Sequence, residues 1–143
     1  MQRIQFAALS AIAVAAALTL AGCSTSSEPA ETTAAAGSCE VIRVQVRDIS
    51  NGAQNKLAMV TDPAADGEYL GDLITRVDEL KADAESDEVV AKLDDLETAL
   101  TEAQTTVEAL PTPTEDSETP DTTEQSEAVS KSATAVTVAC DAE

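Results

Sequence analysis

The chain has 143 residues, which suits a single domain, and 27 acidic against 8 basic side chains give it a formal net charge of −19. It contains no His, which excludes Ser-His-Asp and Cys-His nucleophiles and imidazole metal ligands. The negative charge argues against nucleic acid as a partner, and the presence of one Tyr, one Phe and no Trp argues against stacking surfaces for sugars or bases.

The first 22 residues have the pattern of a secretory signal peptide. Arg3 is the only charged residue before position 28, and an apolar stretch rich in Ala and Leu runs from Ile4 to Leu20. A transmembrane helix is the alternative, but a span needs about 20 apolar residues, and this shorter stretch contains polar residues. A basic start, an apolar core and small residues at the end predict export.

The apolar stretch ends in Leu20-Ala21-Gly22-Cys23. These residues match the lipobox, so the N-terminal segment resembles that of a bacterial lipoprotein precursor. The resemblance implies that residues 1–22 are removed and that lipid on Cys23 anchors the mature chain at the extracytoplasmic face of the cell membrane. Acyl chains contribute about 0.8 kcal/mol per buried methylene, so two or three chains anchor permanently. The composition also resembles small acidic helical lipoproteins of unknown function from high-GC Gram-positive bacteria.

Residues 23–38 are expected to form a flexible tether. The segment from Ser24 to Ser38 has no bulky apolar residue, so it cannot contribute to a core. When fully extended it would reach at most about 50 Å. The domain proper is therefore expected at 39–143.

Cys39 and Cys140 remain once Cys23 carries lipid. Two remaining cysteines in an exported protein predict one disulfide, and two free thiols are the alternative. A metal site is disfavoured because neither C-x-x-C spacing nor His accompanies the pair. A bridge here would close a loop of about 100 residues and, by the chain-entropy argument, stabilise the domain by roughly 4–5 kcal/mol.

The segment 39–60 fits either a helix or a strand. Ile42, Val44 and Val46 alternate with polar residues as in a half-buried strand, and Asn51-Gly52 is a strong hairpin signal. A helical stripe nevertheless continues through the glycine, and we expect a helix that Gly52 weakens. The stripe consists of Cys39, Ile42, Val46, Ile49, Ala53, Leu57 and Val60.

Two helices are predicted next, each with apolar residues recurring every three or four positions. The first is expected to begin at Asp62-Pro63, with Asp as cap and Pro at the first helical position. The second is expected to begin at Ser86 or Asp87 and to end before Pro111. The very short link between them predicts antiparallel packing. Their stripes are Leu70, Leu73, Ile74, Val77, Leu80 and Ala84, then Val89, Leu93, Leu96, Leu100, Ala103, Val107 and Leu110.

Residues 111–127 hold six acids and no base and are expected to form an acidic linker. The segment 126–140 fits a helix through Val129, Ala133 and Val136, or a strand that pairs with the start of the domain. In a four-helix up-down bundle the first helix begins where the fourth ends, which would place Cys39 beside Cys140. We therefore predict an all-α fold, a small antiparallel bundle of three to four helices closed by one disulfide.

Chemistry-bearing patterns are weak. The carboxylates lie opposite the apolar stripes, where a solvated face is the simplest interpretation, because an acid–base pair needs walls that separate two pKa values. Asp62, Asp66 and Gly67 match three EF-hand positions, but Ala64 and Leu73 stand where further ligands are needed. We predict no catalytic residue, metal ligand or cofactor. The acids weighed are Asp78, Glu79, Asp83, Glu85, Asp94, Asp95 and Glu97.

Three further residues have two interpretations each. Tyr69 lies either at the edge of the core or in a binding contact, and Arg43 and Arg47 either pair with acids such as Asp48 or bind a lipid headgroup or partner. The function expected from the sequence is a non-catalytic interaction module of the cell envelope that meets a basic protein. The alternative is a carrier of lipid or another apolar ligand between Ala-rich helices.

Overall fold

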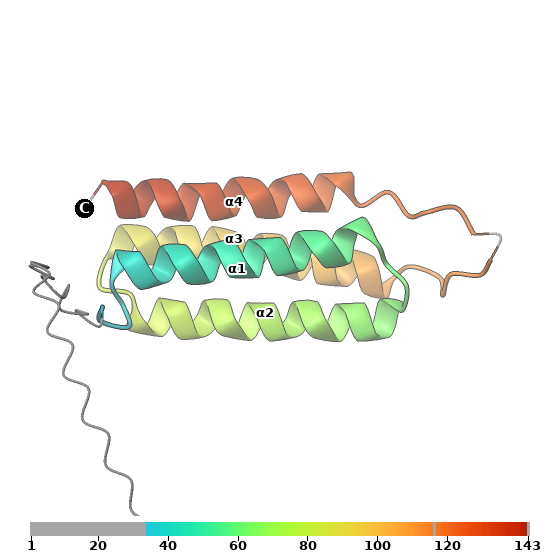
Figure 1. Cartoon of the computed structure of the whole chain (residues 1–143), viewed down its shortest axis with the longest axis horizontal. Helices are drawn as coiled ribbons and strands as arrows, with labels where there is room; N and C mark the ends of the chain where they lie inside the picture. Colours follow the sequence, from blue (N-terminus) through green and yellow to red (C-terminus); the bar gives the residue numbers. More distant parts are fainter. Residues whose placement is uncertain (1–33, 116, 143) are drawn as a thin grey trace, which may run out of the picture. The chain divides into compact units, whose positions relative to one another are not determined.

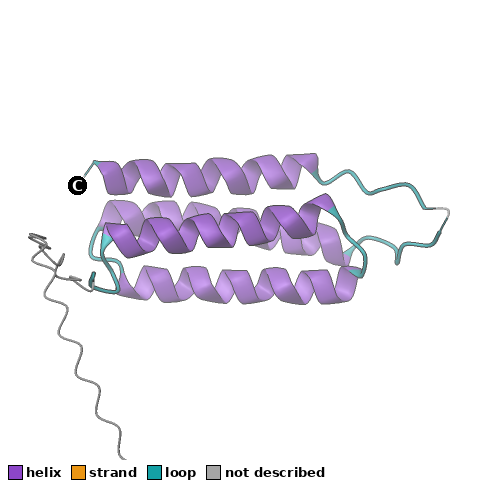
Figure 2. Cartoon of the chain, in the orientation of Figure 1, coloured by secondary structure: helices purple, strands orange, loops and turns teal. Residues whose placement is uncertain are grey.

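Four helices, and no strand, make up residues 34–115 and 117–142, the part of the chain that the computed structural model describes (Figures 1 and 2). They are α1 (Cys39–Ala58), α2 (Pro63–Asp83), α3 (Asp87–Glu108) and α4 (Thr123–Asp141). The predicted signal peptide and Cys23 lie outside the described residues. Of the predicted tether, 34–38 is described, and Ser38 N donates to the carbonyl of Ala35 at 2.9 Å in a turn that leads into α1.

The helices form an antiparallel four-helix bundle in which each runs opposite to the one before it (Figure 1). α1 and α3 each pack against both α2 and α4, and the pair α1/α2 is the least closely packed of the four neighbouring pairs. The start of α1 and the end of α4 lie at the same end of the bundle, where the Cys39–Cys140 disulfide joins them with 5.2 Å between the Cα atoms. The predicted all-α bundle and its disulfide are confirmed.

The segments 39–60 and 126–140, which fitted either a helix or a strand, are helical in α1 and α4. α1 continues through Asn51-Gly52 because apolar residues at helical spacing stand on both sides of the glycine, and its buried face includes Ile42, Ile49 and Leu57. A strand would have placed that stripe on both faces of a sheet. The helix ends at Ala58, and Val60 is buried in the loop that follows.

The core contains the predicted stripes from all four helices. Its largest members are less than 2% exposed, and each such aliphatic side chain stabilises the fold by roughly 1.5–3 kcal/mol. Four predicted stripe residues are only partly buried against it: Cys39, Ile74, Ala84 and Leu110. The fully buried large side chains are Ile42, Val46, Ile49, Leu70, Leu73, Val77, Val89, Leu93, Leu96, Leu100, Val107 and Val129.

The helix starts follow from local capping. The Asp62 carboxylate accepts a hydrogen bond from Ala65 N at 3.2 Å, and the Ser86 hydroxyl accepts one from Val89 N at 3.5 Å. α4 begins at Thr123, three residues before the predicted segment 126–140 and inside the predicted linker 111–127. The predicted boundary was wrong because residues 123–125 are all polar and carry no periodic signal. At the start of the helix the Asp121 carboxylate accepts a hydrogen bond from Thr123 N at 3.1 Å, which gives this backbone N–H a partner.

Candidate interaction surfaces

The end of the bundle that contains the disulfide is held by Arg43. Its guanidinium donates to the carbonyl of Cys140 at 2.8 Å and pairs with the carboxylate of Asp141 at 2.9 Å. Arg47 pairs with Asp48 at 3.5 Å, in a contact whose two side chains are both more than half exposed. Of the two interpretations of these arginines, pairing with local acids therefore describes their contacts, and Arg43 also ties α1 to α4.

Charge is divided unequally between the two sides of the bundle. α2 and α3 together hold 13 acidic and 3 basic side chains, a net charge of −10, whereas α1 and α4 hold 5 acidic and 4 basic ones, a net charge of −1. Eleven of the 13 acids on α2 and α3 are exposed. We call this pair of helices the acidic side. It contains six of the carboxylates weighed above, and Glu85 lies in the link between α2 and α3.

Lys81 bridges the acidic side at one point. Its ammonium lies 2.7 Å from Asp94, 2.5 Å from Glu97 and 3.3 Å from Asp78, so one cation on α2 serves three carboxylates. The hydrogen bonds that Lys81 donates to Asp94 and then to Glu97 raise the pKa of Lys81 above its ordinary value, because they favour the charged form. No local pattern in the sequence indicates this cluster, because 13 and 16 residues separate Lys81 from its two partners on α3.

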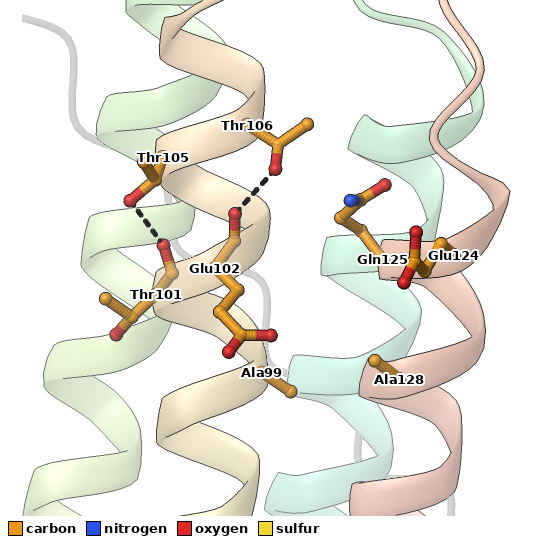
Figure 3. A pocket seen from close by; sticks show the side chains of 8 residues that line it. All are labelled: Ala99, Thr101, Glu102, Thr105, Thr106, Glu124, Gln125 and Ala128. Atoms are coloured by element: carbon orange, nitrogen blue, oxygen red, sulfur yellow. Dashed lines mark hydrogen bonds between the residues drawn. The ribbon is translucent and has the colours of Figure 1, made fainter.

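A groove runs between α3 and α4 on the opposite edge of α3 (Figure 3). Two adjoining hollows of about 430 and 440 Å³ share Ala99, Glu102 and Ala128, and the two alanines leave the gap between the helices. Lys92 and Lys131 line one end of it. The rest of the lining is mostly Thr, Ser, Glu and Gln, and four of the threonine hydroxyls of α3 are bonded to carbonyls of their own helix. Polar residues therefore make up most of the lining, and the groove is open to solvent rather than an enclosed chamber.

A buried carboxylate organises the opposite end of the bundle, where α1 turns into α2. Asp66 is 2% exposed and accepts hydrogen bonds from Lys56 Nζ at 2.7 Å, Thr61 N at 3.0 Å and Asp62 N at 3.2 Å. Burial by itself raises the pKa of Asp66, but the hydrogen bond from Lys56 and those from the two backbone amides outweigh it and leave that pKa below its ordinary value. The carboxylate therefore holds the loop and the end of α1 together.

The structure gives both aspartates of the EF-hand pattern other partners. Asp62 caps α2 and Asp66 is fully engaged with Lys56 and the loop amides. Within 34–115 and 117–142 there is no group of three or more His, Cys, Asp or Glu side chains that could hold a metal ion.

Tyr69 lies at the edge of the α1–α2 contact, with 36% of its surface exposed. Lys56 Nζ stands 5.2 Å from the centre of its ring, within the range of a cation–π contact. The two interpretations of Tyr69 came from the sequence alone, which does not show that Lys56 and Gly52 lie beside its ring or that Lys56 pairs in turn with Asp66. That convergence depends on the register between α1 and α2.

No protein-family model, curated protein or solved structure matches this chain. Among the described helices none has both the length and the apolarity needed to cross a bilayer. What the fold and its surfaces define is a disulfide-closed four-helix bundle with one strongly acidic side.

Proposed function

We propose that this protein is a non-catalytic, membrane-anchored lipoprotein of the cell envelope, and that its acidic side binds basic partner proteins. The observation that carries the proposal is the difference in net charge between the two sides of the bundle, −10 on α2 and α3 against −1 on α1 and α4. An acidic chain selected only for solubility has no need to concentrate its acids on one pair of helices.

A one-sided charge has a definite physical consequence. It steers a basic protein toward α2 and α3 and raises the association rate, and salt screens this steering. Lys81 and Lys92 are already paired with carboxylates of the acidic side, so they reduce its negative potential only near those pairs. The exposed carboxylates that have no cation within 4 Å among the described residues, including Glu79, Glu88 and Glu102, are the ones available to a partner.

The proposed anchor is compatible with this use of the surface. Lipid on Cys23 would hold the chain at the extracytoplasmic face of the membrane, and the chain enters the bundle at Cys39. The disulfide places the end of α4 at the same point. The long sides of the helices and the opposite end, which contains the α1–α2 loop, are then the surfaces left for partners.

The experiment is chemical cross-linking on cells of the native host that display the full-length chain, at two salt concentrations. We expect a basic envelope protein to be recovered, less of it at high salt, and several-fold less with Glu79→Gln, Glu88→Gln and Glu102→Gln combined. The matched control changes Glu40, Glu124 and Glu127 to Gln on α1 and α4. Equal recovery with both triple variants would contradict the proposal.

Lipidation is tested separately by metabolic labelling with a fatty acid analogue. The label should enter the wild-type chain and be absent from Cys23→Ala, which should also leave the membrane fraction. Carriage of an apolar ligand remains the alternative function. The α3–α4 groove does not favour this carrier function, since it is lined mainly by polar side chains. A lipid-sized adduct in native mass spectrometry of Thr33–Glu143 would support it.

A further inference from the structure

A hollow of about 450 Å³ lies on the surface where the last turns of α1 meet the start of α2. It is lined by Gly52, Asn55, Lys56, Met59, Thr61 and Tyr69. Two of these carry large apolar surfaces to solvent, since Met59 is 70% exposed and Tyr69 is 36% exposed. Met and Tyr are enriched at the centres of protein interfaces, where they fill pockets of the partner or form their walls.

Tyr69 can lie against α1 because position 52 has no side chain. A Cβ atom built on Gly52 would stand 2.6 Å from the Tyr69 hydroxyl and 3.5 Å from the ring carbon that bears it. Without that atom, the tyrosine lies directly against the backbone of α1. The same glycine that weakens the helix therefore sets the position of the aromatic wall.

The opposite wall is fixed by the buried carboxylate. Asp66 accepts from the amides of Thr61 and Asp62, which hold the loop just after Met59. It also neutralises Lys56 at 2.7 Å, the one cation in the lining. The apolar walls are thus held in place and the local positive charge is already matched.

Lys56 is the one charged residue in the lining, but acidic residues lie close by along the chain. Asp72 is one helical turn from Tyr69 on α2, and Asp62 and Glu68 are sequence neighbours of Thr61 and Tyr69; all three are exposed. A second copy of this chain would bring these like charges together. A partner with cationic groups around an aliphatic side chain would match both these acids and the apolar walls.

We propose that this hollow is the docking site for a basic amphipathic segment of a partner protein, which inserts an aliphatic side chain between Met59 and Tyr69. The inference rests on the proposed function and adds the chemistry of the partner and the point of contact. The site lies at the end of the bundle opposite the Cys39–Cys140 disulfide. α1 spans 20 residues, so the site is roughly 20–30 Å from the point where the chain enters the bundle.

Tyr69 makes the test specific, because it is the one Tyr of a chain without Trp, so its emission reports on the hollow alone. The sample is Thr33–Glu143, a compact unit whose core comprises its own residues. The probes are two synthetic 14-residue peptides with equal numbers of lysines, one with Leu and one with Ser at the remaining positions. Binding is followed by anisotropy of a label on the peptide, and the hollow by Tyr69 emission.

We expect the Lys/Leu peptide to bind saturably and change Tyr69 emission, and the Lys/Ser peptide to bind more weakly without changing it. Met59→Ser should lower the affinity of the protein for the Lys/Leu peptide at least about fivefold. The matched control Val138→Ser, at an apolar side chain 61% exposed on α4, should leave its affinity unchanged. Thermal unfolding of both variants checks that their folds are intact.

Equal, salt-sensitive binding of both peptides with constant Tyr69 emission would overturn the docking site and leave the acidic side as the binding surface. Failure of both peptides to bind at low salt would overturn the proposed function as well. A change in Tyr69 emission with protein concentration alone, in the absence of peptide, would show that a second copy occupies the hollow and would also overturn the proposal.

Discussion

The hydroxyl of Thr122 donates a 2.6 Å hydrogen bond to the backbone carbonyl of Leu57, 65 residues earlier in the chain. Leu57 lies in the last turn of α1, where carbonyls have no partner within the helix. Thr122 is 6% exposed and directly precedes α4. The bond therefore joins the end of α1 to the start of α4, and the disulfide joins the same two helices at their other ends.

Replacing Thr122 with Val should lower the free energy of unfolding by about 1–2 kcal/mol, because the buried carbonyl of Leu57 loses its donor while the side-chain volume stays similar. Urea denaturation measures the change. The matched control is Thr98→Val, whose exposed hydroxyl bonds to Asp94 of its own helix, and its effect should remain within about 0.5 kcal/mol. Equal losses in the two variants would show that the α1–α4 bond does not contribute to stability.

The disulfide should account for a large share of the stability. It links residues 101 positions apart, so Cys39→Ser with Cys140→Ser is expected to lower the free energy of unfolding by roughly 4–5 kcal/mol, chiefly by freeing the unfolded chain. Urea curves with and without a reducing agent check this. The reductant should shift the wild-type curve to that of the double variant and leave the double variant unchanged. A wild-type curve that the reductant does not move would contradict the prediction.

α2 and α3 could be predicted from the sequence because each carries a long apolar stripe and a recognisable start. Leu93, Leu96 and Leu100 fix the buried face of α3 before any neighbour is known. The short segment 126–140 could not be assigned by periodicity alone. The expected disulfide favoured a helix without deciding it, because two terminal strands paired antiparallel would also bring Cys39 and Cys140 together. The structure settles the assignment, since this segment is a helix that packs against α1 and α3.

The surfaces were predictable only in part. Net charge and the presence of a single Tyr could be taken from composition, but the pairing of Lys56 with Asp66 depends on how the α1–α2 loop folds back. The division of charge between the two sides could not be inferred until the order of helices around the bundle was known. Such features arise from the register and the neighbours of each helix, which a single sequence does not encode in its local pattern.

Gly52 and Tyr69 should be energetically coupled. Alanine favours a helix over glycine by up to about 1 kcal/mol, but its Cβ would stand 2.6 Å from the Tyr69 hydroxyl. Gly52→Ala should therefore stabilise the Tyr69→Phe protein by about 0.5–1 kcal/mol and the wild type by less, or not at all. A double-mutant cycle in urea measures the coupling.

The control for this cycle is Gly71→Ala, whose Cβ would approach only the amide of Gln104, at 3.3 Å. That variant should show the same effect in the wild-type and Tyr69→Phe backgrounds. If the two substitutions at 52 and 69 were additive within about 0.3–0.5 kcal/mol, the contact between α1 and the tyrosine would not be close enough to constrain the ring.

Asp66 should make the stability of the bundle depend on acid. Its pKa in the folded protein lies below the ordinary 3.8, so the unfolded chain binds more protons between these two pKa values. The contribution of Asp66 is therefore fully present above about pH 4–5 and is lost as pH falls through the folded pKa. Asp66→Asn removes the charge that Lys56 and the two loop amides stabilise, and should cost about 1–3 kcal/mol at neutral pH.

The measurement is urea denaturation of the wild type and Asp66→Asn from pH 7 down to pH 2, taken as a difference so that the other carboxylates cancel. The difference should be constant near neutrality and shrink below pH 4, because a protonated Asp66 resembles the amide. Lys56→Met should also destabilise the protein at pH 7, since it leaves Asp66 buried without its cation, and its deficit should shrink in the same acid range. Deficits that do not change with pH would mean that the Asp66 charge does not stabilise the fold.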